Sequence, residues 1–92
     1  MGKIVFEEDN KRSAAYDGEK NIGESTYSKS EKLWIIDHTM VDPNYRGQNI
    51  AAKLVSEVVE NARKQGVKIM PLCPFAKKEF ENKPEYADVW AK

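Results

Sequence analysis

The first 41 residues follow a period-two pattern of apolar and polar positions, which is typical of β-strands. Polar stretches divide this pattern into four segments, and we predict strands over residues 3–7, 13–16, 21–27 and 33–41. Asp17-Gly18 predicts a tight turn because both residues tolerate a positive φ. Residues 28–32 predict a second, solvated turn. The apolar run Leu33-Trp34-Ile35-Ile36 is nearly continuous, which predicts a strand buried on both faces.

The second half changes to helical spacing. A wide apolar stripe runs through residues 50–62, and Gly66 stands where a helix C-terminus favours a left-handed residue. A further buried strand is predicted over residues 67–72, then a short helix over 75–80 and one more helical turn over 86–90. This order predicts one α+β domain spanning residues 1–92. Its sheet of about five strands is mostly antiparallel, with the long helix packed on it and a short C-terminal helix.

Composition narrows the classes of function. The 92 residues carry 15 basic and 15 acidic side chains, and this neutrality argues against a general nucleic-acid binder. No apolar run approaches the roughly 18 residues of a membrane span, and no signal peptide opens the chain, so we expect no membrane partner. One cysteine cannot form an internal disulfide, which favours a reducing, cytoplasmic setting. A single Cys and a single His make a dedicated zinc site improbable.

The loop between the strongest strand and the longest helix has the makings of an anion site. It reads Val41-Asp42-Pro43-Asn44-Tyr45-Arg46-Gly47-Gln48-Asn49-Ile50-Ala51. The first N–H groups of a helix have no intrahelical partner, and the helix dipole places partial positive charge there. Gly47 lets the backbone approach a phosphate and Arg46 adds a cation. On the loop alone, an ordinary connection with Asn49 as helix N-cap explains the residues slightly better. Tyr45 is interpreted as an anchor of the loop against the helix.

With its flanking elements, this loop resembles the pyrophosphate loop of the GNAT superfamily of N-acetyltransferases. That loop reads Arg or Gln, two residues, Gly, one residue, Gly or Ala, and Arg46 to Ala51 matches it with Asn49 in place of the central Gly. Asn is the non-glycine residue that most readily adopts the left-handed conformation. The resemblance covers nearly the whole chain in shortened form, because the usual pair of helices after the first strand and the C-terminal strands are missing.

The resemblance implies acetyl-coenzyme A as cofactor. It places the thioester beside the backbone of Met40 and Val41, and the phosphates at Arg46, Gly47, Gln48, Asn49, Ile50 and Ala51. Pro74, Phe75, Lys77 and Lys78 of the last helix are further candidates for cofactor contact, although Lys77 and Lys78 are equally well explained as a solvated face and Phe75 as core.

The chain is most similar to a small stand-alone subfamily with a His on the fourth strand and a Cys after the fifth, where His38 and Cys73 stand. Larger members carry a Tyr that protonates the leaving sulfur, but the matching position here is Phe80. Two mechanisms stay open: Cys73 as an acetyl-accepting nucleophile activated by His38, or direct attack by the amine with either residue moving protons. Taken separately, each residue is more simply read as structural.

The leading hypothesis is therefore an N-acetyltransferase acting on a primary amine, whether a protein lysine, an N-terminus or a small polyamine. The missing flanking elements imply an open acceptor side that suits a peptide or protein. The alternatives are a non-catalytic coenzyme A-binding module and a protein-interaction module without cofactor. We expect a monomer or weak dimer.

Overall fold

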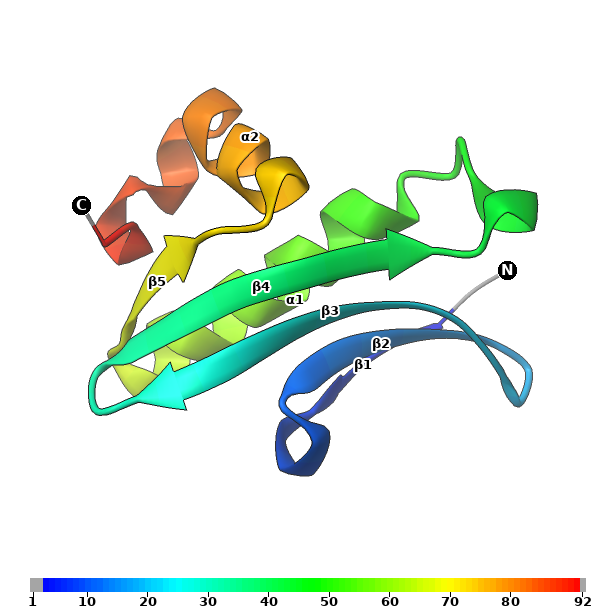
Figure 1. Cartoon of the computed structure of the whole chain (residues 1–92), viewed down its shortest axis with the longest axis horizontal. Helices are drawn as coiled ribbons and strands as arrows, with labels where there is room; N and C mark the ends of the chain where they lie inside the picture. The colour runs from blue at the N-terminus through cyan, green and yellow to red at the C-terminus, as the bar shows by residue number, and fades with distance from the viewer. Residues whose placement is uncertain (1–2, 92) are drawn as a thin grey trace.

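The computed structural model describes residues 3–91, which form one five-stranded sheet in the order β1-β2-β3-β4-β5. The strands are β1 (Lys3–Glu7), β2 (Arg12–Asp17), β3 (Lys20–Ser30), β4 (Leu33–Val41) and β5 (Lys68–Pro71) (Figure 1). The first four strands pair antiparallel as successive hairpins, and β5 joins β4 in parallel. The predicted α+β class, strand order and mostly antiparallel sheet are confirmed.

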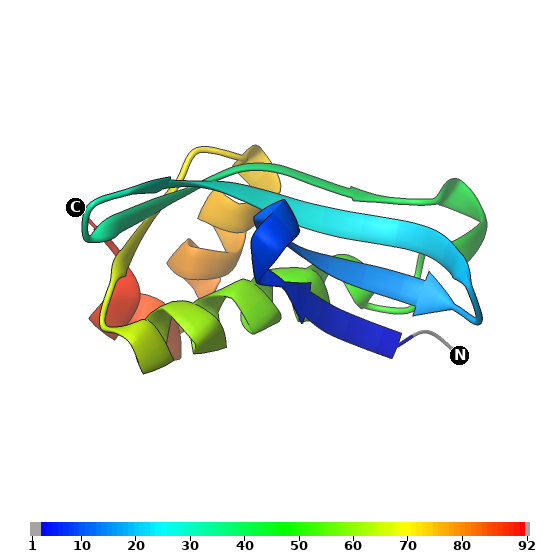
Figure 2. The same ribbon diagram turned by 90° about the horizontal axis from the view of Figure 1, so that it is seen from below.

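Two helices complete the fold, α1 (Ile50–Gln65) and α2 (Pro74–Asn82), and both lie on the same side of β3 and β4 (Figure 2). The apolar stripe of α1 packs under the sheet, and Gly66 ends the helix at φ +70° as its sequence predicts. Short 3₁₀ segments follow β1 (Glu8–Asn10) and β4 (Pro43–Tyr45), and a third one (Pro84–Val89) follows α2. No helix of residues 3–91 is long and apolar enough to cross a bilayer.

The core lies between the sheet and the two helices. Trp34 and Ile36 of β4 pack there with Val55 and Val58 of α1 and Phe80 of α2. Leu33 and Ile35 alternate with the buried residues of β4 and are only partly covered, so the prediction of a strand buried on both faces was wrong. The reason is that α1 and α2 share one face of the sheet, which leaves the other face without a described helix (Figure 2).

Two predicted boundaries and one turn also differ from the predictions. Residues 28–30 belong to β3 rather than to a turn, because Lys29 pairs with Trp34 and its ammonium lies 5.7 Å from the centre of the indole ring. In the β2–β3 turn, only Gly18 has a positive φ. The predicted strand over 67–72 is shorter at both ends, because its pairing with β4 spans only Lys68 to Pro71.

The short pairing of β5 leaves an opening in the sheet. β4 pairs with β5 only from Leu33 to Ile36, whereas its pairing with β3 on the other edge runs from Leu33 to Val41. The backbone N–H groups of Leu72 and Cys73 both donate to the Ile36 carbonyl oxygen at 3.0 Å, which marks the point where the two strands separate. The last five residues of β4, from Asp37 to Val41, therefore face a gap on that edge.

Candidate functional site

The loop from β4 to α1 begins with a self-contained 3₁₀ turn. The Asp42 carboxylate accepts a hydrogen bond from the Asn44 backbone N–H at 2.9 Å and so caps the turn. The Tyr45 N–H donates to the Asp42 carbonyl oxygen at 2.9 Å. Pro43 at the first position fits because its fixed φ suits a turn of this kind. Arg46 then returns to an extended conformation and is exposed.

At the end of this loop, the backbone N–H groups of residues 47–49 make no hydrogen bond to another backbone group or side chain of the described residues. Gly47 has φ +82° and Asn49 has φ +64°, so left-handed residues alternate with other conformations just before the helix. Residues that alternate between right-handed and left-handed conformations can turn successive N–H groups toward one side, where they bind an anion. Residues 46–49 are the candidate for such a nest and are called the nest below. The Asn49 side chain makes no capping hydrogen bond, and the first turn of α1 contains no acidic residue. Its first N–H groups are therefore available to an anion.

A cavity of about 620 Å³ opens beside this nest. This volume is within the usual range for small-molecule sites. Its walls come from the free end of β4, the loop, the first turn of α1 and the first turn of α2. The residues that line it are Thr39, Met40, Val41, Pro43, Tyr45, Arg46, Gly47, Asn49, Ile50, Ala51, Ala52 and Phe75.

Eight of the twelve residues expected at a cofactor line this cavity, namely Met40, Val41, Arg46, Gly47, Asn49, Ile50, Ala51 and Phe75. The other four, Gln48, Pro74, Lys77 and Lys78, are exposed and do not line it. Sequence reasoning missed Thr39, Pro43, Tyr45 and Ala52 as lining residues. Thr39, Tyr45 and Ala52 are immediate neighbours of expected residues and Pro43 lies two residues after Val41, so position close to the motif was the available signal.

The backbone of β4 presents one of its two predicted N–H groups to the gap. The Asp42 N–H donates to the Ile22 carbonyl oxygen of β3 at 2.7 Å. Because backbone groups of successive strand residues point to opposite edges, the Val41 N–H points away from β3, toward the gap. A Cβ atom built on Gly23 would lie 3.0 Å from the Met40 carbonyl oxygen, so the backbone groups of Met40 face β3 instead. Of the two, only the Val41 N–H faces the gap.

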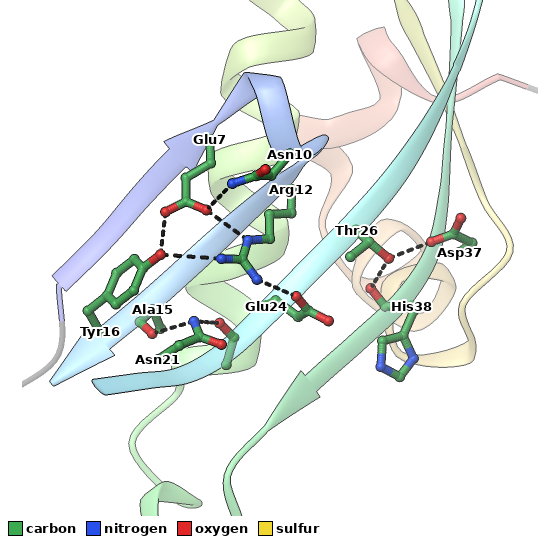
Figure 3. A network of polar contacts seen from close by, with 11 residues as sticks. Glu7, Asn10, Arg12, Ala15, Tyr16, Asn21, Glu24, Thr26, Asp37 and His38 are labelled. Carbon is green, nitrogen blue, oxygen red and sulfur yellow. Dashed lines mark hydrogen bonds and ion pairs between the residues drawn. The ribbon is translucent and has the colours of Figure 1, made fainter. Parts of the chain in front are cut away.

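His38 and Cys73 flank the separation of β4 and β5 from opposite faces of the sheet. Cys73 is 7% exposed and packs in the core between sheet and helices, as the residue that precedes α2. His38 pairs with Thr26 on the face away from α1 and is exposed. Its carbonyl oxygen accepts a long contact of 3.5 Å from the Thr26 hydroxyl, and the imidazole points away from it (Figure 3). Within residues 3–91, no hydrogen bond or ion pair joins the two side chains.

A polar network on the open face of β1, β2 and β3 was not predicted from the sequence. Arg12 forms ion pairs with Glu7 at 2.8 Å and with Glu24 at 2.7 Å, and the Tyr16 hydroxyl donates to Glu7 (Figure 3). The hydrogen bond from Tyr16, followed by that from Arg12, lowers the pKa of Glu7 to about 2. The four side chains surround fully buried Ala14, so the network covers a part of the sheet that no helix covers.

The described residues include no group of three or more His, Cys, Asp or Glu side chains that could hold a metal ion. The cavity instead offers backbone N–H groups, the Arg46 guanidinium and apolar walls, a donor set that suits a phosphorylated organic ligand.

Comparisons with known proteins agree with this geometry. Residues 12–89 match the model of a family described as GCN5-related N-acetyltransferases. An NMR structure of a GCN5-like protein from Staphylococcus aureus is 34% identical, with a TM-score of 0.77 over 97% of this chain and 87% of that one. No curated protein matches the chain.

Two more distant structures share the fold. The ribosomal-protein-S18-alanine N-acetyltransferase of Escherichia coli is 16% identical, with a TM-score of 0.67 over 77% of this chain and 49% of that one. The N-acetylglutamate synthase of Neisseria gonorrhoeae, in complex with coenzyme A and N-acetyl-glutamate, is 14% identical, with a TM-score of 0.66 over 86% of this chain and 21% of that one. On the family match and the Staphylococcus aureus structure, the chain belongs to the GCN5-related N-acetyltransferase (GNAT) family, which uses acetyl-CoA.

Proposed function

We propose that this protein binds acetyl-CoA in the cavity beside α1 and transfers the acetyl group to a primary amine, whether a protein lysine, an N-terminus or a small polyamine. The observation that carries the proposal is the convergence of three features on one cavity: the nest at Gly47 and Asn49, the uncapped start of α1, and the free end of β4. When bound, acetyl-CoA supplies an activated thioester. The residues of this chain bind it, orient it and move the proton.

Binding rests on charge and on oriented backbone groups. The N–H groups at the start of α1 and the Arg46 guanidinium hold the pyrophosphate, at the positive end of the helix dipole. The apolar side chains of Val41 and Phe75 line the path between this end and the gap in the sheet. The Val41 N–H would donate to the thioester carbonyl oxygen and would stabilise the negative charge that develops there during attack.

We propose that the acceptor amine enters from the face of β4 that bears His38 and Met40, which are both exposed. No described helix covers this face, so an extended peptide has room to approach. In direct attack, the C–N bond to the amine would form as the C–S bond breaks, and His38 or water would take the amine's proton and return it to the departing thiolate. The assignment to the subfamily with a Cys and His pair is part of this proposal, as is a cytoplasmic setting.

Cys73 offers a second route, in which its thiolate takes the acetyl group first and then passes it to the amine. Its burial on the helix side of the sheet favours direct attack. The two routes separate in a single-turnover experiment without acceptor, where only the Cys73 route gives an acetylated protein by intact mass. Cys73→Ala abolishes that adduct and turnover together if the thiol is the nucleophile. Under direct attack it retains turnover and loses only about 1 kcal/mol of stability from the small cavity it leaves.

The experiment that tests the proposal is a thermal-shift titration with acetyl-CoA. A ligand at about 100 times its Kd stabilises the native state by about 2.7 kcal/mol, which raises the Tm of a domain of this size by several degrees. Arg46→Ala should weaken the response. Lys64→Ala, which removes an exposed cation near the other end of α1, is the matched control and should respond as the wild type. No response of the wild type at millimolar acetyl-CoA would refute the proposed function.

A non-catalytic coenzyme A-binding module is the alternative, favoured by one observation. Phe80 stands where larger relatives carry the Tyr that protonates the sulfur, and it is 2% exposed and packed against Tyr86 and Trp90. The module would bind acetyl-CoA without turnover. Release of free thiol from acetyl-CoA in the presence of a lysine peptide or spermidine distinguishes the two, with His38→Ala expected to lower the rate while leaving the thermal shift intact.

A further inference from the structure

The loop from β4 to α1 is hydrogen-bonded to the β2–β3 hairpin, which lies far from it in sequence. The Tyr45 hydroxyl donates to the Asp17 carboxylate at 2.6 Å, across 28 residues of chain. Asp17 is the last residue of β2 and pairs with Lys20 across the two-residue turn Gly18-Glu19. Only Gly18 takes a positive φ there, so Asp17 keeps its strand conformation and its side chain is free to meet Tyr45.

The hairpin holds both ends of the 3₁₀ turn. The Tyr45 ring packs against the cluster of Ala15, Ile22, Ile50 and Leu54. The Lys20 ammonium lies 5.9 Å from the centre of that ring and 3.8 Å from an Asp42 carboxylate oxygen. The hydrogen bond to Asp17 raises the pKa of Tyr45, so its hydroxyl remains a donor at neutral pH.

The residues that follow have no comparable support. Within the described chain, no side chain of residues 46–49 makes a hydrogen bond or ion pair, and all four residues are exposed. Their backbone contacts are a long bond of 3.4 Å from the Arg46 N–H to the Pro43 carbonyl oxygen and the first helical bond to Asn49. Tyr45, which directly precedes Arg46, is held by the contacts described above. The position of Tyr45 therefore determines where residues 46–49 begin.

We propose that the Tyr45–Asp17 pair is a positioning device that holds residues 46–49 in the conformation that binds the phosphates of acetyl-CoA. The inference rests on the proposed function and deepens it. Tyr45 lines the cavity, but its hydroxyl is engaged by Asp17, so it acts through the loop. A loop that is already ordered binds an anion without losing further conformational entropy. When the pair is broken, the loop loses this entropy on binding, and the affinity for the anion falls.

The first test is Tyr45→Phe, which keeps the ring in its cluster and removes only the hydroxyl. We expect the Kd for acetyl-CoA to rise about tenfold, the size expected for the loss of a hydrogen bond to a charged acceptor. The loss should fall on the KM for acetyl-CoA more than on kcat, because the loop binds the end of the cofactor that does not react. Tyr27→Phe is the matched control. It removes a buried hydroxyl that has no hydrogen-bond partner among the described residues and does not line the cavity.

The second test is a double-mutant cycle with Asp17. Asp17→Ala should weaken binding as Tyr45→Phe does, and the double variant should be no weaker than either alone, because both changes remove one interaction. Asp17→Asn keeps an acceptor oxygen and should restore part of the affinity. A merely structural role would not produce this rescue at constant Tm.

The third test needs no cofactor. The amides of Asn44, Tyr45 and Lys53 are hydrogen-bonded within the loop and the first turn of α1, and their hydrogen exchange in the free protein should speed up in Tyr45→Phe and Asp17→Ala. Exchange in β3, and in α1 beyond its first turn, should stay unchanged. Wild-type affinity and loop exchange in Tyr45→Phe, or fully additive effects in the cycle, would overturn the inference. If the wild type does not bind acetyl-CoA, the proposed function fails, and the exchange comparison still decides whether the pair orders the loop.

Discussion

Asn49 departs from the glycine usual in its family, and replacing it tests the geometry of the whole site. Asn49 has φ +64° and ψ +22° and makes no capping hydrogen bond, so a substitution there removes no side-chain contact of that kind. Its effect is conformational. A left-handed conformation costs an ordinary L-residue about 1–2 kcal/mol, less for Asn and little for Gly, and it makes a β-branched residue a clear outlier.

These values give a graded expectation. Asn49→Gly relieves the left-handed strain but adds about 0.4–1 kcal/mol of unfolded-state entropy, so its stability should stay near that of the wild type. Asn49→Ala should lose about 1 kcal/mol and Asn49→Val about 2 kcal/mol, which correspond to roughly 4–8 °C and 8–16 °C in Tm for a domain of this size. The side chain of Asn49 is exposed, so packing adds little to this order.

Affinity should follow the same order as stability, for a separate reason. A Val at position 49 can relieve its backbone strain by leaving the left-handed region. That change turns the N–H groups of the nest away from the anion. Thermal denaturation gives the stability series, and calorimetric titration with acetyl-CoA gives the affinities. Equal Tm and equal affinity for the Gly and Val variants would refute the reasoning, because they would mean that neither the fold nor the site needs a left-handed residue there.

Three further outcomes follow from particular contacts. Gly23→Ala should cost about 1–3 kcal/mol and weaken acetyl-CoA binding, because the added Cβ would lie 3.0 Å from a carbonyl oxygen of β4 at the cavity wall; an unchanged Tm would contradict this. Phe80→Tyr should lower stability by about 1–3 kcal/mol without raising turnover, because its hydroxyl would be buried; faster thiol release would place residue 80 at the reacting sulfur instead. The pKa of Glu7 is depressed to about 2 by Tyr16 and Arg12, so its stabilising effect is complete above the unfolded pKa near 4.5 and disappears as the pH falls through 2. Denaturant unfolding should therefore show a gap between wild type and Glu7→Gln at pH 7 that closes between about pH 5 and 2, and a gap that does not depend on pH would contradict it.

Local patterns in the sequence predicted most of the fold. The helical stripe of α1, its stop at Gly66 and the alternation in β1 to β4 are each determined by neighbouring residues. The errors came from tertiary placement. Whether the run Leu33–Ile36 is covered on one face or two depends on where α2 packs, and α2 lies on the same side as α1 (Figure 2). The full length of β3 likewise depends on its pairing with β4.

The same difference between local patterns and tertiary placement applies to the site. The interpretation of Arg46 to Ala51 as a phosphate loop came from the resemblance to the GNAT family, because the loop alone was explained slightly better as an ordinary connection. Its left-handed residues before a helix start are a local feature. Local patterns do not determine the separation of β4 from β5, because it arises from where β5 ends against its neighbour, and only the family resemblance implied it. The pairing of Tyr45 with Asp17 joins two segments 28 residues apart. The sequence predicted Tyr45 as an anchor of the loop against the helix, and it did not predict the bond to Asp17. The roles of Cys73 and His38 stay predictions.

The most direct test of the central claim is an amide NMR titration of the protein with acetyl-CoA, which suits a chain of 10.5 kDa. Binding in the cavity should give saturable shifts of the amides of residues 47–52 and of Val41, with small changes in β1 and β2. Desulfo-CoA, which keeps the phosphates and lacks the thioester, should shift the amides of 47–52 but affect Val41 less. No shift at millimolar acetyl-CoA, or shifts confined to residues outside the cavity, would mean that acetyl-CoA does not bind in the cavity beside α1.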